Sequence, residues 1–194
     1  KTRAAGHLLS TKDICTLSLL PELLESGVAS LKIEGRMKSP EYVAGVTGIY
    51  RKYLDLYYSG ATYTVDPKDT VILQQLFNRG SFSTGYLRTH SGSAMMCPTH
   101  PRAWGVHVGT VLDHDAKKRQ ATVRFEKEMI PGDGIEIRTD DEEGIGCYVE
   151  KPCAAGQTLQ LRIEGKAAKH QEVWQTYDKR LMDSLRPSYE TIRR

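Results

Sequence analysis

The sequence predicts a two-part protein of class α/β plus all-β: the terminal β/α unit of a (β/α)8-type barrel followed by a small antiparallel β-barrel. Two observations predict this class. Residues 10–58 alternate between helix-type and strand-type patterns, whereas from residue 104 to 163 hydrophobic residues recur with a period of two between Gly and Asp turns. The expected domains are the last part of the barrel at residues 1–60, a connector at 61–103, the small β-barrel at 104–166 and a C-terminal extension with a helix at 167–194.

The composition is that of a soluble globular protein. Of 194 residues, 39% are hydrophobic and 26% are charged, and the formal net charge is +3. Acidic and basic residues are mixed along the chain, which does not favour nucleic-acid binding. No apolar run approaches the roughly 20 residues of a membrane span, and the first residues contain no signal-peptide core. We therefore expect a cytoplasmic protein without a membrane partner. Because the chain lacks an initiator Met and opens in mid-pattern, we expect it to be a fragment of a longer one.

The first expected element is a short helical hairpin over residues 10–27. Ser10 and Asp13 have the three-residue spacing of a capping box. Pro21 suits the first turn of the segment PELLESG, and Gly27 closes that segment.

The next expected elements are a strand in SLKIEG and a long helix after it. In a strand alternate residues share a face, so Leu31 and Ile33 form an apolar side. Lys32 and Glu34 form a charged side. Ser39 is a suitable N-cap with a proline directly after it, and apolar residues then recur at helical spacing up to residue 57. A (β/α)8 barrel takes roughly 250 residues, so the missing barrel part is expected from the same full-length chain or from an oligomer.

The connector is expected to hold one short helix, in DPKDTVILQQLFNRG, and then a surface stretch rich in Ser, Thr, Gly and Pro. Five or six short strands follow, in GVHVGTVLDHD, QATVRFE, GDGIEIRT, GCYVE and TLQLRIE, which suggests the small antiparallel barrel. The tail is expected to begin extended and then to form an amphipathic helix around Leu181, Leu185 and Tyr189.

The charged side of the strand in SLKIEG is the main candidate for chemistry. In a parallel barrel the outward face packs on helices, so Lys32 and Glu34 would point inward, toward an active site. Glu34 would serve as a general base or as an ion-pair partner, and Arg36 would hold a carboxylate or phosphate. A structural layer of salt bridges, or an exposed edge strand, accounts for the pattern equally well.

The cysteines and histidines show no metal-binding spacing. Cys15, Cys97, Cys147 and Cys153 contain no C-x-x-C pair, which predicts isolated thiols. The six histidines are scattered: His7, His90, His100, His107, His114 and His170. The glycine-bracketed stretch LFNRGSFSTGYL has neither a P-loop lysine nor a nucleophile elbow.

Three stretches carry a resemblance to a known family. LLSTKDICTLSLLPELLESGVASLKIEGRMKSPEYVAGVTGIYRKYLD resembles the closing part of the catalytic barrel of the collagenase-like peptidases, family U32. LFNRGSFSTGYL, followed by MM and a Gly-Val strand, resembles the same family's connector into a small β-barrel similar to those of translation elongation factors. VWQTYDKRLMDSLR is similar to segments of the longer members. The chain is thus identified as the C-terminal portion of a member.

The resemblance implies alternative functions. Family members are named as peptidases, some of them collagen-degrading, which implies a protein or peptide substrate for the complete protein and no activity for this portion alone. Related members act in hydroxylation of tRNA or rRNA, or of a ubiquinone precursor, and several carry a four-iron four-sulfur cluster. In those relatives a cysteine at the position of Cys15, in KDIC, is a cluster ligand, and the other ligands lie upstream. This chain alone is therefore expected to hold no cluster. A third alternative is a substrate-binding module without catalytic activity.

Overall fold

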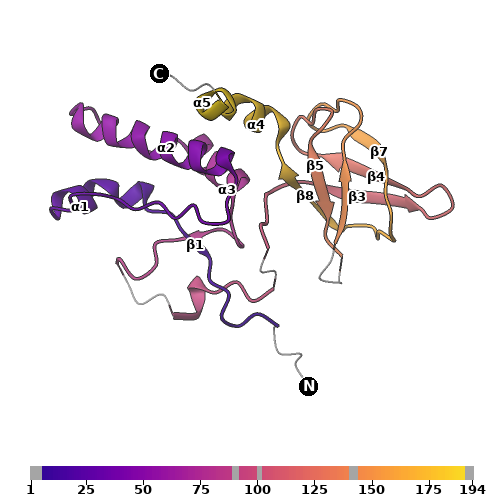
Figure 1. Cartoon of the computed structure of the whole chain (residues 1–194). Coiled ribbons are helices and arrows are strands. Elements are labelled where there is room, and N and C mark those ends of the chain that lie inside the picture. Colours follow the sequence, from indigo (N-terminus) through magenta and orange to yellow (C-terminus); the bar gives the residue numbers. More distant parts are fainter. Residues whose placement is uncertain (1–5, 89–91, 100–101, 140–143, 191–194) are drawn as a thin grey trace. The chain divides into compact units, whose positions relative to one another are not determined.

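The computed structural model describes residues 6–88, 92–99, 102–139 and 144–190, which belong to two compact units (Figure 1). Unit 1 comprises residues 1–104 and 185–194, and unit 2 comprises residues 105–184. Helices dominate unit 1 and antiparallel strands dominate unit 2, so the predicted mixture of helical and all-β parts is confirmed. None of the helices in the described segments combines the length and the apolar character that a membrane crossing requires.

Unit 1 opens on a short strand where a helix was predicted. Strand β1 (Asp13–Ile14) pairs in parallel with β2 (Phe82–Ser83). The backbone N–H of Lys12 donates to the carbonyl of Met95, 2.8 Å away. The capping box predicted at Ser10 and Asp13 is therefore wrong, because this segment is held by partners some 70 residues away, which local spacing does not reveal.

A helical turn follows where the sequence predicts one. The 3₁₀-helix η1 (Leu17–Leu19) leads directly into α1 (Leu20–Glu25), and Pro21 lies in its first turn. Gly27 has a φ of 85°, a left-handed conformation that glycine adopts without a steric penalty, and it ends the segment as predicted.

The strand predicted in SLKIEG is absent. Residues 28–35 are all described, and they form no β-ladder. A strand needs a neighbouring strand for its backbone hydrogen bonds, and none lies beside this segment among the described residues. The predicted alternation nevertheless holds. Leu31 and Ile33 are half-buried against the helical core, and Lys32 and Glu34 are exposed.

The two longer helices of unit 1 form where they were predicted. Helix α2 (Pro40–Tyr58) begins after Ser39, whose Oγ accepts a hydrogen bond from the N–H of Tyr42 at 3.3 Å. Helix α3 (Pro67–Leu76) begins after Asp66, whose carboxylate accepts from the N–H of Lys68 at 2.8 Å. The two helices pack together around buried residues from η1, α1, α2 and α3: Leu17, Leu20, Val46, Ile49, Tyr53 and Leu73.

A buried polar contact joins α2 to α3. The hydroxyl of Tyr53, a residue only 1% exposed, donates to Asp69 Oδ2 at 2.6 Å and accepts from the N–H of Asp66 at 2.8 Å. Lys52 Nζ lies 2.6 Å from the same Asp69 oxygen. Burial alone would raise the pKa of Asp69, but the hydrogen bonds from Lys52 and Tyr53 outweigh it and lower that pKa. The stabilising effect of this contact is therefore present at neutral pH and is lost as the pH falls through the lowered pKa.

The Tyr53→Phe variant is expected to lower the free energy of unfolding of unit 1 by about 1–3 kcal/mol, because the buried Asp69 loses a donor and the Asp66 N–H loses its acceptor. Urea denaturation followed by helical circular dichroism measures the loss. Tyr58→Phe is the matched control, since Tyr58 is 70% exposed. Equal stabilities for the two variants would show that the Tyr53 hydroxyl contributes nothing.

The C-terminal helix is broken in two. Helix α4 (Lys179–Leu185) ends before Pro187, and α5 (Pro187–Glu190) begins at it. Proline lacks an N–H and disfavours helical geometry in the residue before it, so the single predicted helix is interrupted there. Within unit 1, the hydroxyl of Tyr189 in α5 donates to Glu41 Oε1 at 2.5 Å.

Unit 2 is a six-stranded antiparallel sheet. Its strands are β3 (Val106–Asp115), β4 (Gln120–Phe125), β5 (Gly134–Ile137), β6 (Ile145–Tyr148), β7 (Thr158–Arg162) and β8 (Glu172–Tyr177). The spatial order is β6-β5-β8-β3-β4-β7, and the sheet curls as Figure 1 shows. Alternate residues of the strands fill one apolar core, with fully buried members including Val108, Val111, Val123, Phe125, Ile137 and Val173.

Two predictions about this domain need correction. Strand β8 lies between β5 and β3, so the β-domain continues to residue 184 and does not end at residue 166. The extended start of the tail was predicted, but its place inside the sheet was not. Strands β6 and β7 are the two edges and form no ladder with each other among the described residues, so the sheet is a curled half-barrel and its ladder does not close.

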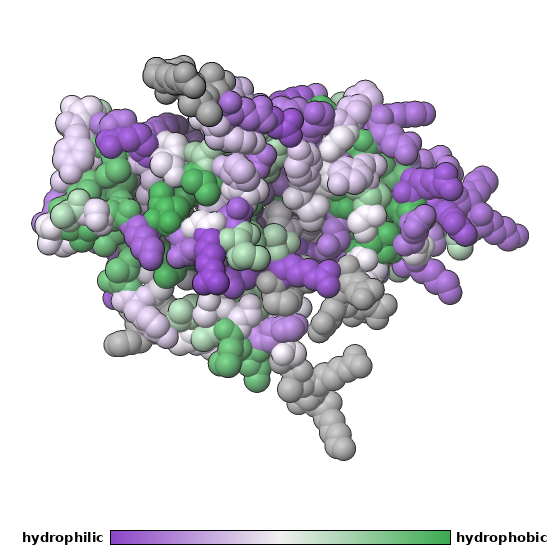
Figure 2. All heavy atoms as spheres, in the orientation of Figure 1, coloured by the Kyte–Doolittle hydropathy of each residue, from purple (hydrophilic) through white to green (hydrophobic). Residues whose placement is uncertain are grey.

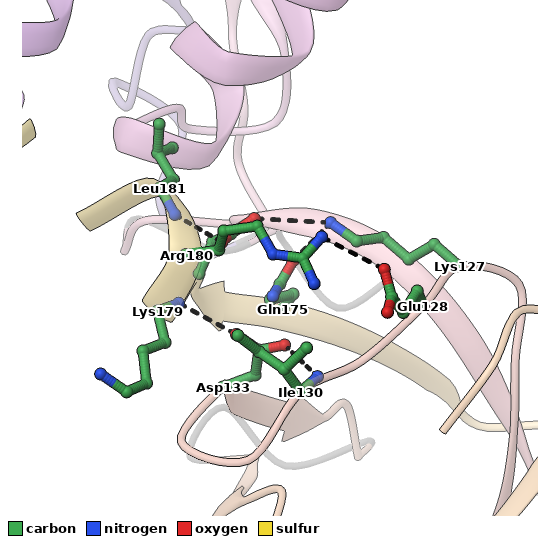
Figure 3. Close-up of polar contacts among 9 residues, drawn as sticks. Lys127, Glu128, Ile130, Asp133, Gln175, Lys179, Arg180 and Leu181 are labelled. Carbon is green, nitrogen blue, oxygen red and sulfur yellow. Dashed lines mark hydrogen bonds and ion pairs between the residues drawn. The ribbon is translucent and has the colours of Figure 1, made fainter. Parts of the chain in front are cut away.

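Asp133 joins the start of α4 to the loop before β5 (Figure 3). This residue is only 2% exposed. One carboxylate oxygen accepts from the N–H of Lys179 and the other from the N–H of Ile130, both at 2.9 Å. A buried carboxylate satisfied by two backbone donors thereby holds the loop before β5 to the first residue of α4.

Candidate functional site

The charged residues predicted as catalytic lie together on the surface of unit 1. Lys32 Nζ is 4.0 Å from Glu34 Oε2, and their side chains are 89% and 69% exposed. The backbone N–H of Arg36 donates to Glu34 Oε1 at 2.9 Å. In the described part of the chain these groups face solvent, so a catalytic role for Glu34, Arg36 and Lys32 stays a prediction for the complete protein.

Cys15 occupies a different place, in the wall of a small cavity of unit 1. The cavity holds about 50 Å³ and lies between β1, α2 and the segment around β2, with Asp13, Cys15, Tyr42, Tyr50, Phe77 and Phe82 among its lining residues. Cys15 is half-buried and directly follows β1, where its N–H donates to the carbonyl of Ser83 at 3.0 Å. Lys32, Glu34 and Arg36 do not line this cavity.

The hydroxyls near Cys15 stay neutral. Tyr50 accepts from the backbone N–H of Thr16 at 3.0 Å, and burial raises the pKa of Tyr50. The hydroxyl of Tyr63 donates to the carbonyl of Leu17 at 2.5 Å, and burial raises the pKa of Tyr63 to about 12. Neither phenol therefore offers a base to the thiol of Cys15 at neutral pH.

The carboxylate in the cavity wall, that of Asp13, is bound to Arg79. Arg79 donates to it through the backbone N–H at 2.8 Å, through Nη2 at 2.8 Å and through Nε at 3.2 Å. The hydrogen bonds from the guanidinium to the Asp13 carboxylate raise the pKa of Arg79, and the whole contact fixes the loop after α3 against β1. Sequence reasoning missed it. The glycine-rich stretch around Arg79 was noticed, but nothing local indicates a partner 66 residues away.

A second cation lies beside this ion pair. Lys38 Nζ is 2.8 Å from the ring centroid of Phe77 and 5.7 Å from that of Tyr42. Burial lowers the pKa of Lys38, while the charge of Asp13 opposes that shift and the charge of Arg79 adds to it. Lys38 and Arg79 thus lie next to Phe77 and Asp13, two of the residues that line the Cys15 cavity.

The four cysteines, all of which lie in the described residues, form no disulfide with one another. Cys97 and Cys153 are buried, and Cys147 is half-buried. Burial raises the pKa of Cys153 and, together with the charge of Glu150, raises the pKa of Cys147 to about 11. Within the described segments no three His, Cys, Asp or Glu side chains gather as a metal site would require. His90 and His100 lie outside the described residues.

These features define a two-unit protein: a helical unit with a cysteine-containing cavity, and a curled antiparallel sheet. The model of "Peptidase family U32" matches residues 1–96, a range that includes Cys15, Glu34 and Arg79. The chain belongs to peptidase family U32, as its resemblance to the collagenase-like peptidases predicted.

The relatives of the chain have names of two kinds, one that refers to tRNA hydroxylation and others that refer to proteolysis. It is 32% identical over 154 residues to the "tRNA hydroxylation protein P1" of Bacillus subtilis, covering 75% of this chain and 35% of the relative. It is 41% identical over 136 residues to the "Uncharacterized protease MJ0090" of Methanocaldococcus jannaschii, covering 68% of this chain and 33% of the relative. It is 33% identical over 191 residues to a "Collagenase" of Porphyromonas gingivalis, covering 90% of this chain and 51% of the relative. The chain thus spans about a third to a half of these proteins.

Proposed function

We propose that the complete protein containing this chain is an RNA-hydroxylating enzyme of family U32, acting on tRNA or rRNA, with Cys15 at its reaction centre. The relative from Bacillus subtilis, whose name refers to tRNA hydroxylation, aligns with three quarters of this chain at 32% identity, which supports the substrate class. Lys32, Glu34 and Arg36 would then contact RNA or the reacting groups, once the residues outside this chain complete the barrel.

The surroundings of Cys15 are the observation that carries this proposal. A cysteine peptidase needs a base within hydrogen-bonding reach of its thiol. Here the Asp13 carboxylate is bound to Arg79, and burial keeps the Tyr50 phenol neutral. In the described residues Cys15 thus has the setting of a half-buried ligand and lacks that of an activated nucleophile.

Cys15 fits a four-iron four-sulfur cluster as one of its thiolate ligands. It is half-buried, and aromatic side chains line the cavity beside it, as suits a group that must be shielded from water. Such a cluster exchanges single electrons when bound, and it needs three further ligands from outside the described residues. This chain contributes the thiol, and Lys38 and Arg79 lie against the lining residues Phe77 and Asp13, where their positive charge would favour a negatively charged group.

Peptide hydrolysis is the second candidate, because two relatives are named a protease and a collagenase. Protein substrate would then bind the complete barrel, and this chain alone would bind without cleaving. Retention of the chain on gelatin without cleavage would correspond to a binding module.

Mass spectrometry of nucleosides decides between these candidates. Cells lacking the complete protein are expected to lose one tRNA or rRNA nucleoside that is heavier by an oxygen atom than its parent, and the wild-type gene should restore it. The purified complete protein is tested in parallel on gelatin and collagen peptides. Unchanged nucleosides together with peptide cleavage would overturn the RNA proposal and support the peptidase.

A further inference from the structure

The outer face of strands β4 and β7 is polar along its whole length. In both strands, side chains that point away from the core alternate with buried ones. The strands pair antiparallel, which places these outward residues opposite one another as Gln120–Arg162, Thr122–Gln160 and Arg124–Thr158. The outward side chains of β4 and β7 therefore supply amide, hydroxyl and guanidinium donors in two adjacent rows.

A basic turn adjoins one end of this face. Lys117, Lys118 and Arg119 connect β3 to β4 directly before Gln120. The carboxylate of Asp115 accepts from the backbone N–H groups of Lys117 and Lys118 at 3.0 and 3.1 Å. These hydrogen bonds lower the pKa of Asp115, which keeps its charge and shapes the turn. The three cations of the turn thus lie beside one carboxylate, that of Asp115. In Figure 2 strongly hydrophilic residues gather at the end of unit 2 that carries this turn.

Several cations of this region lack the ion pairs that four other cations of unit 2 form. The four ion-paired cations each lie within 4.0 Å of a carboxylate: Lys127 of Asp178, Lys169 of Asp113, Lys179 of Asp183 and Arg180 of Glu128. Five cations of the face and its surroundings form no ion pair with another described residue: Lys117, Arg119, Arg124, Lys151 and Arg162. Acidic residues outnumber basic ones in residues 105–184 as a whole, so this concentration of unpaired positive charge is local.

A shallow groove with an exposed aromatic ring runs beside the same strands. It holds about 430 Å³, and its lining includes Gln120, Gln160 and Arg162 from the face. Tyr148 and Lys151, from the end of β6 and the segment after it, line the other side, together with one acidic residue, Glu150. Tyr148 is 69% exposed. A large exposed aromatic side chain among cations suits stacking on a nucleobase.

We propose that the face formed by residues 117–119, β4, β7, Tyr148 and Lys151, called here the β4/β7 face, binds single-stranded RNA. The unpaired cations contact phosphates, the glutamine and threonine side chains contact sugars and phosphates, and Tyr148 stacks on a base. The inference rests on the proposed function and names the surface that would hold the RNA. An extended peptide along the edge of β7 is the competing occupant, but backbone pairing would not explain the excess of unpaired cations.

The test is binding of the 194-residue chain to a labelled single-stranded RNA of about ten nucleotides, measured by fluorescence anisotropy at several salt concentrations. Affinity is expected to fall with salt, and the Lys117→Glu/Arg162→Glu variant is expected to bind about tenfold more weakly or worse. Its plot of log K against log salt should be shallower by about 1.4, since each lost contact with a single strand accounts for about 0.7. Tyr148→Ala should weaken binding about fivefold or more without changing the slope.

The matched control is Lys68→Glu/Arg102→Glu, which changes the charge equally at two exposed residues of unit 1. It should retain the wild-type slope, and circular dichroism verifies that each variant is folded. Equal losses in both double variants, or displacement of the RNA by a gelatin peptide at equal concentration, would overturn the inference. If the chain fails to bind RNA while the complete protein still hydroxylates it, this inference alone fails. If the complete protein does not modify RNA, the proposed function fails as well.

Discussion

Replacing Asp133 with alanine is expected to lower the free energy of unfolding of unit 2 by about 2–5 kcal/mol, because the partly buried N–H groups of Ile130 and Lys179 both lose their acceptor. Domains of this size are stable by only about 5–15 kcal/mol, so the loss is a large fraction of the total. The N–H groups of Ile130 and Lys179 should also exchange with deuterium much faster than in the wild type, because their hydrogen bonds no longer protect them.

The comparison for Asp133→Ala is Glu128→Ala, a neighbouring acidic residue in Figure 3. Glu128 pairs with Arg180 at 3.2 Å, and its side chain is 59% exposed. An exposed pair of this kind contributes at most about 1 kcal/mol. Urea denaturation of unit 2 and hydrogen exchange measure both variants. Unchanged protection of Ile130 and Lys179 in Asp133→Ala would show that these amides have other acceptors.

The Cys15→Ser variant of the complete protein, purified without oxygen, is expected to lose its visible absorbance and most of its iron and labile sulfide. Serine preserves the size of the side chain but supplies no thiolate, which is the ligand that iron–sulfur clusters require. Iron and sulfide per chain and the visible spectrum measure the loss. Cys147→Ser is the control, because burial raises the pKa of that thiol to about 11 and it lies in unit 2. Full iron content in Cys15→Ser would remove Cys15 from the ligand set, and a metal-free wild type would remove the cluster.

The helix boundaries were predictable because they depend on residues close together in the chain. Ser39 caps α2 through an N–H three residues ahead, and Gly27 ends its segment through its own φ angle. The strands of unit 2 were predictable in the same way, since the period of two is a property of each strand alone. Strand β8 shows the limit of such signals, because its sequence indicates an extended segment but not its neighbours β5 and β3.

The candidate site was predictable only in part. Cys15 was singled out from the resemblance of KDIC to a family motif, and it lies half-buried in a cavity wall, while its role as a cluster ligand stays a prediction. Arg79, Lys38 and Tyr50 were not singled out, because their contacts join residues 34 to 66 positions apart or depend on packing against Phe77. The predictions of a capping box at Ser10 and of a strand in SLKIEG were wrong for a related reason. Each had a suitable local pattern, but the conformation depends on which distant segments lie beside it in the fold.

The sequence by itself determined the helical and β-type segments, the helix ends and the apolar and charged sides of the segment around Lys32. Each of these depends on spacing, propensity or a capping contact within a few residues. Only the tertiary structure decided that Asp13 contacts Arg79, that β8 lies inside the sheet and that five cations of the β4/β7 face form no ion pair with another described residue. These are contacts, or missing contacts, between residues far apart in the chain, and they arise when the hydrophobic cores bring those segments together.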